Sequence, residues 1–274
     1  MNNILKDKVI ESALYIRSKI KFSPDIAIIL GSGLGELASM LEDSTKIAYT
    51  DIPHFPKSTV VGHSGELIAG EFNGKKLICL NGRFHYYEGY TMETVTYPVR
   101  VFKKLGVNKI IITNAAGGIN KTFKPGDLMI ITDHINFMCS NPLIGPNDEY
   151  FGPRFPDMGN TYTPSLVDLA MVVAKECGIL LRQGVYVAVS GPTYETPVEI
   201  NMFRLLGGDA VGMSTVPESI VARHMGMDIF AISCIANVAA DLSPVKLTHN
   251  DVIKTVGEAQ EKLLEFISRF IERI

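Results

Sequence analysis

The chain has 274 residues, of which 46% are hydrophobic, and carries a formal net charge of −3 at pH 7. This length and composition predict one α/β domain that spans residues 1–274, and the lack of a basic excess argues against nucleic acid as a partner. The sequence contains no run of 18 apolar residues, so we expect no membrane span.

Short apolar runs that suit buried strands alternate along the chain with segments of helical periodicity. Strands are predicted at 26–30, 76–80, 109–113, 128–132, 185–189, 209–213 and 228–235. Helices are predicted near 4–20, 34–42, 93–105, 164–177, 197–206, 216–225 and 250–273. This alternation is typical of a mixed, largely parallel, twisted sheet with helices on both faces.

Three features of the chain bear on its compartment and on its surface. The N-terminal segment has helical periodicity with interspersed charge and does not resemble a signal peptide. Four scattered cysteines form no C-x-x-C pair, so we expect reduced thiols and a cytoplasmic protein. Residues 136–164 form a long segment rich in Pro, Gly and Asn that also holds five aromatic residues, which favours a functional loop or an interface over disorder.

The first predicted strand runs into a glycine turn, GSGLG, at 31–35. Such a turn before a helix aims backbone N–H groups at one point, which suits an anion. The dinucleotide fingerprint requires a third glycine at the position of Glu36, so the turn does not favour NAD. The motif alone leaves free phosphate, a phosphate ester and a purely structural turn open.

The segment GRFHYYEG at 82–89 follows the strand predicted at 76–80. If the chain stays extended there, a period of two places Arg83, His85 and Tyr87 on one side. An arginine guanidinium matches the oxygen fork of a phosphate group. A surface strand end with a salt bridge to the acidic residue at 88 explains the pattern equally well.

Two strand–helix junctions each carry a threonine followed three residues later by a glutamate, the spacing of a capping box. These pairs are Thr196–Glu199 and Thr215–Glu218. Ser214 then lies just outside a helix N-terminus, where an anion is stabilised. Ordinary helix capping accounts for both pairs but leaves Ser214 unexplained.

Other polar residues at strand ends suit a heterocyclic base. Tyr194 and Glu195 offer an aromatic face and a carboxylate that could accept base N–H groups, although Glu195 could equally be a solvated loop charge. Asn237 ends a long apolar run, and its amide can both donate and accept, although turn formation is the alternative. The small residues at 115–118 would let a flat ligand approach the backbone, and a β-bulge or a tight packing spot explains them as well.

Histidines complete the set of candidate site residues. His63 follows a glycine in GHSG, and His249 is expected in the first turn of the last helix. The six histidines show no H-x-x-x-H or H-E-x-x-H spacing, so no metal site is predicted.

Taken in order, seven motifs resemble those of one family, the purine nucleoside phosphorylases of the homotrimeric class that prefers 6-oxopurines. They are GSGLG (31–35), GH (62–63), GRFHYYEG (82–89), TNAAGG (113–118), GPNDEYFGPRFP (145–156), GPTYET (191–196) and VGMSTVPE (211–218). The resemblance implies a pentosyltransferase of purine salvage. It would cleave inosine, guanosine and their 2′-deoxy forms with phosphate, giving the base and (deoxy)ribose 1-phosphate, without cofactor or metal.

The resemblance also implies roles for individual residues. Phosphate would be held by Ser32, His63, Arg83, His85, the Ala115 backbone and Ser214. The ribose would be held by Tyr87, Met213 and His249, and the base by Tyr194, Glu195 and Asn237. Direct parts in catalysis are implied for His85, Glu195 and Asn237. In the homotrimer, Phe151 would reach into the site of a neighbouring subunit and cover its ribose.

The chain departs from the family pattern at two positions near the base. Tyr194 stands where the family often has Phe, and Ala236 stands where it usually has Thr, so one hydroxyl is missing. Two other functions remain open. A methylthioadenosine phosphorylase is disfavoured by Glu195 and Asn237, because adenine recognition favours an acidic partner for N7 and the 6-amino group. A non-catalytic nucleotide-binding module would use the turn at 31–35 without turnover.

Overall fold

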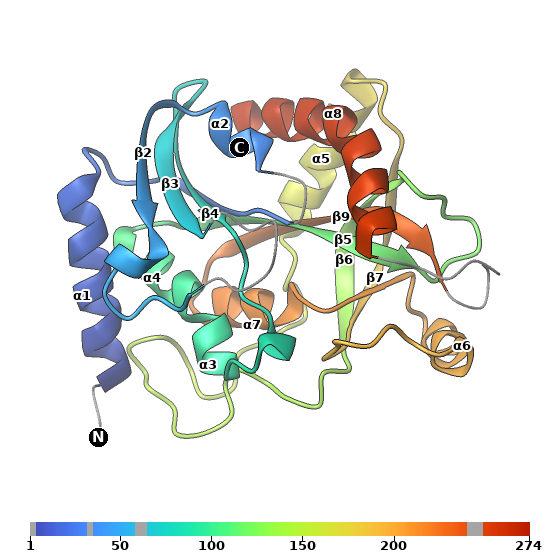
Figure 1. Cartoon of the computed structure of the whole chain (residues 1–274), viewed down its shortest axis with the longest axis horizontal. Coiled ribbons are helices and arrows are strands. Elements are labelled where there is room, and N and C mark those ends of the chain that lie inside the picture. The colour runs from blue at the N-terminus through green and yellow to red at the C-terminus, as the bar shows by residue number, and fades with distance from the viewer. Residues whose placement is uncertain (1–3, 32–34, 58–64, 240–248) are drawn as a thin grey trace.

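Figure 1 shows a computed structural model of the chain, which describes residues 4–31, 35–57, 65–239 and 249–274. The helices are α1 (Ile4–Lys19), α2 (Glu36–Ser39), α3 (Met92–Val95), α4 (Tyr97–Leu105), α5 (Pro164–Glu176), α6 (Pro197–Leu205), α7 (Val216–His224) and α8 (His249–Arg273). The strands are β1 (Ile26–Ile29), β2 (Glu42–Ala48), β3 (Glu66–Phe72), β4 (Lys75–Asn81), β5 (Lys109–Gly118), β6 (Leu128–Asn136), β7 (Leu181–Ala188), β8 (Ala210–Gly212) and β9 (Asp228–Val238).

The strands form one mixed sheet in the order β2-β3-β4-β1-β5-β8-β7-β6-β9. Because β9 also pairs with β5, the strands from β5 to β9 close on themselves, which the sequence analysis did not predict. Five of the nine pairings between the described strands are parallel, so the predicted mixed, largely parallel sheet is confirmed.

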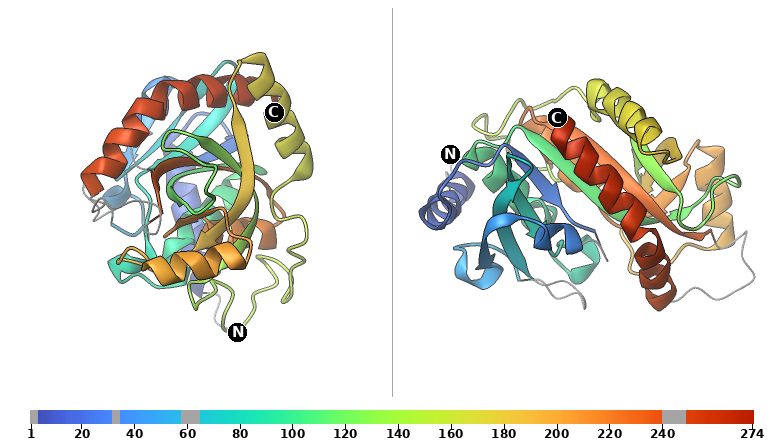
Figure 2. Two further views of the ribbon diagram at one scale, coloured as in Figure 1. Left: turned by 90° about the vertical axis from the view of Figure 1, so that its right-hand side faces the viewer. Right: turned by 90° about the horizontal axis from the view of Figure 1, so that it is seen from above.

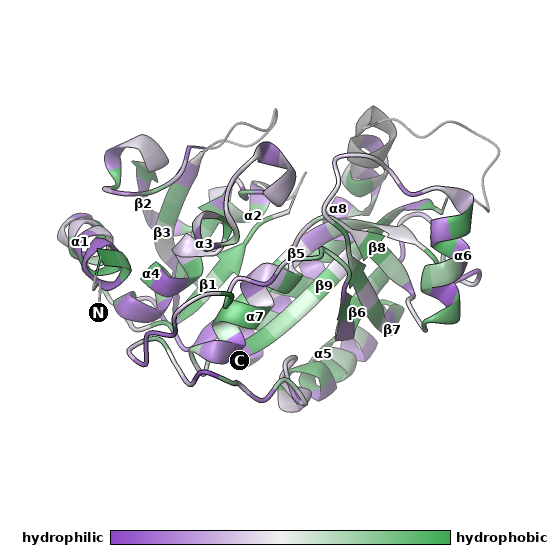
Figure 3. Cartoon of the chain, turned by 90° about the horizontal axis from the view of Figure 1, so that it is seen from below, coloured by the Kyte–Doolittle hydropathy of each residue, from purple (hydrophilic) through white to green (hydrophobic). Residues whose placement is uncertain are grey.

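Successive side chains of β1 pack alternately into two cores on opposite faces of the sheet. Ala27 and Ile29 pack in the core that α1, α4 and α7 cover. Ile26 and Ile28 pack in the core that α2, α5 and α8 cover. Strands buried on both faces read as continuous apolar runs, which is why β1 was predictable and why its ribbon is largely green in Figure 3.

The two ends of the molecule are occupied by different helices. In Figures 1 and 2, α1 lies at one end and α6 at the other, with the sheet between them. A third, smaller core, which includes Ile200 and Phe203 of α6, packs against Val187 and Val211. Within the part of the chain that the structure describes, no helix is long and apolar enough to cross a membrane.

Several elements differ from their predicted extent. The helix predicted at 93–105 is split into α3 and α4, because Pro98 has no N–H with which to continue the first helix. The helix predicted at 34–42 is reduced to α2, since the chain turns at Met40 into β2. Both β2 and β3 were missed, and together they extend the sheet beyond β4 through antiparallel pairing.

This topology brings four strand ends to one edge. Strands β4, β1, β5 and β9 are parallel neighbours, so their carboxyl ends lie together. Gly31, Arg83 and Asn237 lie within two residues of the carboxyl ends of three of these strands. Ligands of α/β sheets bind outside such an edge, so the fold brings these candidate residues to a place suited to a ligand.

Candidate active site

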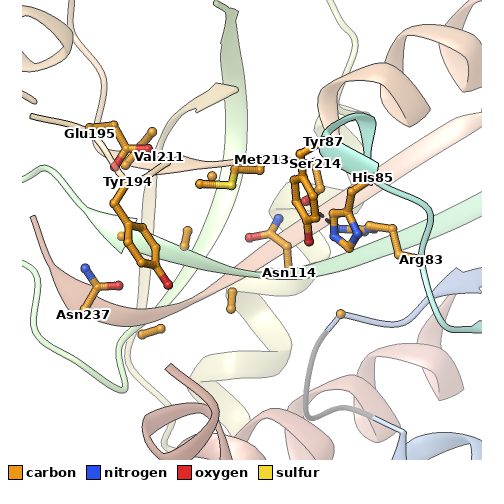
Figure 4. A pocket seen from close by; sticks show the side chains of 16 residues that line it. Arg83, His85, Tyr87, Asn114, Tyr194, Glu195, Val211, Met213, Ser214 and Asn237 are labelled. Atoms are coloured by element: carbon orange, nitrogen blue, oxygen red, sulfur yellow. Dashed lines mark hydrogen bonds between the residues drawn. The ribbon is translucent and has the colours of Figure 1, made fainter. Parts of the chain in front are cut away.

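A single pocket at this edge gathers most of the predicted site residues (Figure 4). Its 16 lining residues come from the ends of β1, β4, β5 and β9 and from the segments around 194 and 213. They are Gly31, Arg83, His85, Tyr87, Asn114, Ala115, Ala116, Gly117, Tyr194, Glu195, Val211, Gly212, Met213, Ser214, Ala236 and Asn237.

The pocket has two chemically distinct ends. Figure 4 shows Arg83, His85, Tyr87 and Ser214 at one end and Tyr194, Glu195 and Asn237 at the other, with Met213 between them. We call these groups the cationic end and the carboxamide end. One elongated ligand that carries an anion at one terminus and a hydrogen-bonding ring at the other matches this division.

Arg83 is the buried cation of the cationic end. Its Nη1 donates to Oγ of Ser214 at 2.6 Å, and its Nη2 donates to the carbonyl oxygen of Thr113 at 3.0 Å. Its Nε lies 3.1 Å from Oε1 of Glu218. The salt bridge to the acidic residue at 88, the structural alternative for this segment, belongs to His85 instead.

His85 is held by the glutamate three residues later. Nδ1 of His85 lies 3.2 Å from Oε1 of Glu88, and the backbone N–H of His85 donates to the same oxygen at 2.6 Å. The imidazole stacks on the phenol of Tyr87, with ring centroids 4.7 Å apart. Burial, reinforced by the charge of Glu88, raises the pKa of Tyr87 to about 12, so its hydroxyl keeps its proton.

The backbone before His85 differs from the extended chain that was predicted. Strand β4 ends at Asn81, Gly82 has a φ of 122°, and a 3-10 turn covers Tyr86–Glu88. The predicted separation of side chains still holds, because Arg83, His85 and Tyr87 all line the pocket while Phe84 packs in the core.

The predicted capping box Thr215–Glu218 is wrong. Thr215 has a φ of 73° and a ψ of −48°, and its side chain makes no capping bond. The N–H of Val216 donates to the carbonyl oxygen of Ser214 at 2.8 Å, which closes a rare, strained γ-turn centred on Thr215. The hydroxyl of Thr215 accepts from Nδ2 of Asn114 at 2.9 Å. Strain of this kind at a pocket wall is typical of binding sites, since it aims the preceding residue, Ser214, at the ligand.

The carboxamide end follows the second capping box, which is confirmed. Oγ1 of Thr196 accepts from the N–H of Glu199, and the Glu199 carboxylate accepts from the N–H of Thr196, which fixes the start of α6. Glu195 directly precedes this cap. Burial raises the pKa of Glu195 above its usual value, and the nearby Glu199 charge adds to the effect. Nδ2 of Asn237 donates to the carbonyl oxygen of Val238 at 2.9 Å.

Between the two ends the pocket wall is built from small residues. A Cβ on Gly117 would lie 3.4 Å from both Nδ2 of Asn237 and Cγ1 of Val211, so a side chain there would crowd the carboxamide end. Gly191 lets the side chain of Met213 approach, because a Cβ on Gly191 would lie 2.4 Å from Sδ of Met213. Strand β5 also shifts register against β9 between Ala116 and Gly117, so the bulge and packing alternative for residues 115–118 is confirmed, while Ala115, Ala116 and Gly117 line the pocket as well.

Four predicted site residues are not placed in the pocket. Ser32 and His63 lie outside the described residues, and His249 begins α8 but its side chain is not described. Phe151 lies in the core of its own chain and is 5% exposed. Its ring lies 5.7 Å from Cζ of Arg100. Across the described part of the chain, no group of three or more metal-ligating side chains occurs.

Sequence reasoning missed three polar residues of the cationic end. Asn114 lines the pocket, and Thr215 and Glu218 lie behind it in contact with Arg83. Asn114 follows a run of three apolar residues and a threonine in β5, the same kind of signal that identified Asn237. No sequence signal identifies Glu218 as a partner of Arg83, since the two residues are 135 positions apart and only the fold joins them.

Comparisons with known proteins match this geometry. The model of the phosphorylase superfamily matches residues 25–272. Purine nucleoside phosphorylase 1 of Geobacillus stearothermophilus is 54% identical over 96% of this chain and 96% of the relative. A crystal structure of Schistosoma mansoni purine nucleoside phosphorylase with inosine is 44% identical, with a TM-score of 0.94 over 98% of this chain and 96% of that one. A structure of the Schistosoma mansoni protein with adenosine is also 44% identical, with a TM-score of 0.93 over 98% and 97% of the chains.

The fold expected from the seven motifs and the expected membership of the purine nucleoside phosphorylases are therefore confirmed. The chain belongs to the phosphorylase superfamily and, within it, to the purine nucleoside phosphorylases, which are pentosyltransferases.

Proposed function

We propose that this pocket cleaves 6-oxopurine nucleosides, with phosphate at the cationic end and the base at the carboxamide end. The proposal depends on one observation. Arg83 and Ser214 lie at one end of the pocket, and Glu195 and Asn237 lie at the other end. The ribose then lies between them, against Met213 and Tyr87. We also assign Ser32 and His63 to the phosphate and His249 to the ribose. These three assignments rest only on the family resemblance.

The reaction needs no nucleophile from the protein. The bond between the ribose C1′ and the purine N9 breaks, and its electron pair passes to the purine. Positive charge grows on the sugar, and an oxygen of the phosphate dianion forms the new bond to C1′. Fixing phosphate beside the sugar can lower the barrier by roughly 7 kcal/mol, because the two reactants are already oriented. No organic cofactor or metal is required for these steps.

The departing purine is stabilised by hydrogen bonds that strengthen as it gains charge. We assign this task to the Asn237 amide, at purine N7, and to the Glu195 carboxylate, at the N1–H of a 6-oxopurine. His85 would hold phosphate, with its orientation set by Glu88. A preorganised group of this kind contributes about 3 kcal/mol to the stabilisation of the transition state.

One assay tests the proposed function. Inosine, adenosine and methylthioadenosine are each mixed with the protein, with and without phosphate, and base release is followed by absorbance. We expect release from inosine only when phosphate is present. Release from methylthioadenosine alone would instead support the neighbouring phosphorylase class, and no release from any nucleoside would support a binding module.

Discrimination against adenosine should depend on Glu195. Adenine presents a lone pair at N1, so it would face the carboxylate acceptor to acceptor, at a cost of roughly 1–3 kcal/mol. We expect kcat/KM for inosine to exceed that for adenosine by about 10- to 100-fold, and Glu195→Gln to reduce this ratio to within about threefold, because a glutamine amide can donate to N1. The measurement must follow cleavage, since a related structure binds adenosine.

Glu199→Gln is the matched control for that variant. It removes a charge from the same segment and retains the capping box, in which glutamine substitutes for glutamate. Its ratio should equal that of the wild type. A wild-type protein that cleaves adenosine as fast as inosine would contradict the role given to Glu195.

We also propose that the chain assembles as a homotrimer. The loop between β6 and α5 leaves Ile144 76% exposed and Phe155 87% exposed, and a second copy of the chain would cover such apolar side chains. The family resemblance implies that Phe151 of this loop reaches into the site of a neighbouring subunit. In the single chain Phe151 is buried, so it would have to leave its packing beside Arg100 to reach that site.

Sedimentation velocity tests the assembly. We expect the wild type to sediment with three times the mass of one chain, and Phe155→Asp to sediment with a smaller mass, because a charge would be buried at the interface. A fully active wild-type monomer would refute the homotrimer. A cytoplasmic location is also proposed, and its support is that all four cysteines are free.

A further inference from the structure

The buried pair of Arg83 and Glu218 joins the pocket to helix α7. Both side chains are only 3% exposed, and Oε1 of Glu218 lies 3.1 Å from Nε of Arg83. Glu218 is the third residue of α7 and does not line the pocket. Nothing in the proposed reaction requires this carboxylate, so its place beside the cation calls for a separate explanation.

Three anchors from three parts of the fold orient the guanidinium. The carbonyl oxygen of Thr113 in β5 accepts from Nη2, the hydroxyl of Ser214 accepts from Nη1, and the carboxylate of Glu218 in α7 forms an ion pair with Nε at 3.1 Å. A planar guanidinium that is hydrogen-bonded at both Nη atoms and ion-paired at Nε is restrained from rotating about its long axis. The edge that it presents to the pocket is therefore set before an anion arrives.

The carboxylate also supplies the countercharge that burial demands. An unpaired charge taken out of water is strongly disfavoured, so a buried arginine without a carboxylate would be unstable whenever phosphate is absent. Oε2 of Glu218 is buried and has no hydrogen-bond partner among the described residues. Within that part of the chain, Arg83 is thus the one ion-pair partner of this carboxylate.

Among the residues that the structure describes, Glu218 has no second ion-pair partner. The phenols of Tyr162 and Tyr186 are both buried near it, and its charge contributes to raising the pKa of each. These phenols stay protonated and neutral. The negative charge at this point of α7 therefore acts on Arg83.

We propose that Glu218 is a positioning residue for the phosphate co-substrate: it holds Arg83 buried, charged and aimed at the pocket. The proposal rests on the function proposed for the pocket, since it specifies how the cationic end is prepared. It assigns Glu218 no contact with substrate. Its effect should consequently appear in the use of phosphate and not in the binding of the base.

The test compares Glu218→Ala and Glu218→Gln with the wild type. KM for phosphate is measured at saturating inosine, KM for inosine at saturating phosphate, and hypoxanthine affinity without phosphate. We expect Glu218→Ala to raise KM for phosphate roughly 10- to 100-fold, because Arg83 loses its buried countercharge. KM for inosine and hypoxanthine affinity should change less than about threefold. Glu218→Gln should recover part of the loss, because its amide oxygen keeps a polar, electron-rich atom beside the guanidinium.

Asp127→Ala is the matched control. Oδ2 of Asp127 lies 3.2 Å from Nε of Arg182, so the variant removes an ion pair of similar geometry away from the pocket. It should leave both KM values unchanged. Melting temperatures are recorded for every variant, so that a loss of folded protein is not mistaken for a loss of phosphate affinity.

Each outcome decides between the role of Glu218 and the proposed function. Equal rises in both KM values, or an unchanged KM for phosphate in Glu218→Ala, would overturn the positioning role. If Glu218→Ala does not fold, Glu218→Gln and Glu218→Asp decide by the same comparison, because both retain a polar partner near Arg83. A wild type that releases no base from inosine and phosphate would refute the proposed function itself.

Discussion

Replacing Asn237 with alanine should lower kcat for inosine by about 100-fold or more and change KM for inosine less than about threefold. The reason is that the amide acts on a purine that is gaining charge, so its hydrogen bond is stronger in the transition state than in the bound substrate. Asn237 is the penultimate residue of β9, and its Nδ2 donates to the carbonyl oxygen of Val238, which holds the amide in place before substrate binds. Single-turnover measurements with excess enzyme would show the loss in the chemical step.

Asn108→Ala serves as the control for that variant. Asn108 is an exposed residue whose side chain accepts from Lys103 on the surface, and it lies outside the pocket. Its kinetics should match those of the wild type. A rise in KM for inosine with unchanged kcat in Asn237→Ala would show that Asn237 binds the base without helping it to leave.

The elements that could be predicted from the sequence are those whose burial is uniform. Strands such as β1 and β4 are covered on both faces, so their apolar runs identify them. Strand β2 could not be found in this way, because six of its seven residues are exposed or only partly buried. Strand β3 had a usable signal, since Asn73 and Gly74 join it to β4 as a two-residue hairpin turn with positive φ at both positions.

The candidate site was predictable where it depends on local pattern. The alternating pattern correctly predicted that Arg83 and His85 lie on the same side, although the strand ends before them. The prediction holds because the apolar Phe84 between them is buried in the core, which turns its two neighbours toward the pocket. The capping box at Thr215 failed for the opposite reason. Local spacing favoured a bond between Thr215 and the backbone near Glu218, but the buried charge of Arg83 binds that carboxylate more strongly.

The closure of strands β5 to β9 could not be predicted from any local sequence pattern. It depends on the pairing of β8 with β5 over only two residue pairs, Gly117 with Val211 and Gly118 with Ala210. Small residues make this close approach possible, but the same residues are equally consistent with a bulge or a bound ligand. Which of these a glycine pair serves is settled by tertiary contacts and not by composition.

Replacing Arg83 with methionine should lower kcat/KM for phosphate by roughly 1000-fold and leave hypoxanthine affinity unchanged, since the cationic end loses its one buried guanidinium within the described residues. The same variant should lose about 3–5 kcal/mol of unfolding free energy, because Glu218 is left as an unpaired buried charge. Both quantities are accessible, the first by initial rates at varied phosphate and the second by urea denaturation of the purified protein.

The double variant Arg83→Met with Glu218→Met separates the two effects. Two well-packed apolar side chains can replace a buried ion pair at little cost or with a gain in stability. We therefore expect the double variant to recover most of the unfolding free energy that Arg83→Met loses, while its use of phosphate stays as poor as that of the single variant. Recovery of phosphate use together with stability would mean that Arg83 acts only on the fold. An equally unstable double variant would mean that the loss in Arg83→Met does not come from an unpaired charge on Glu218.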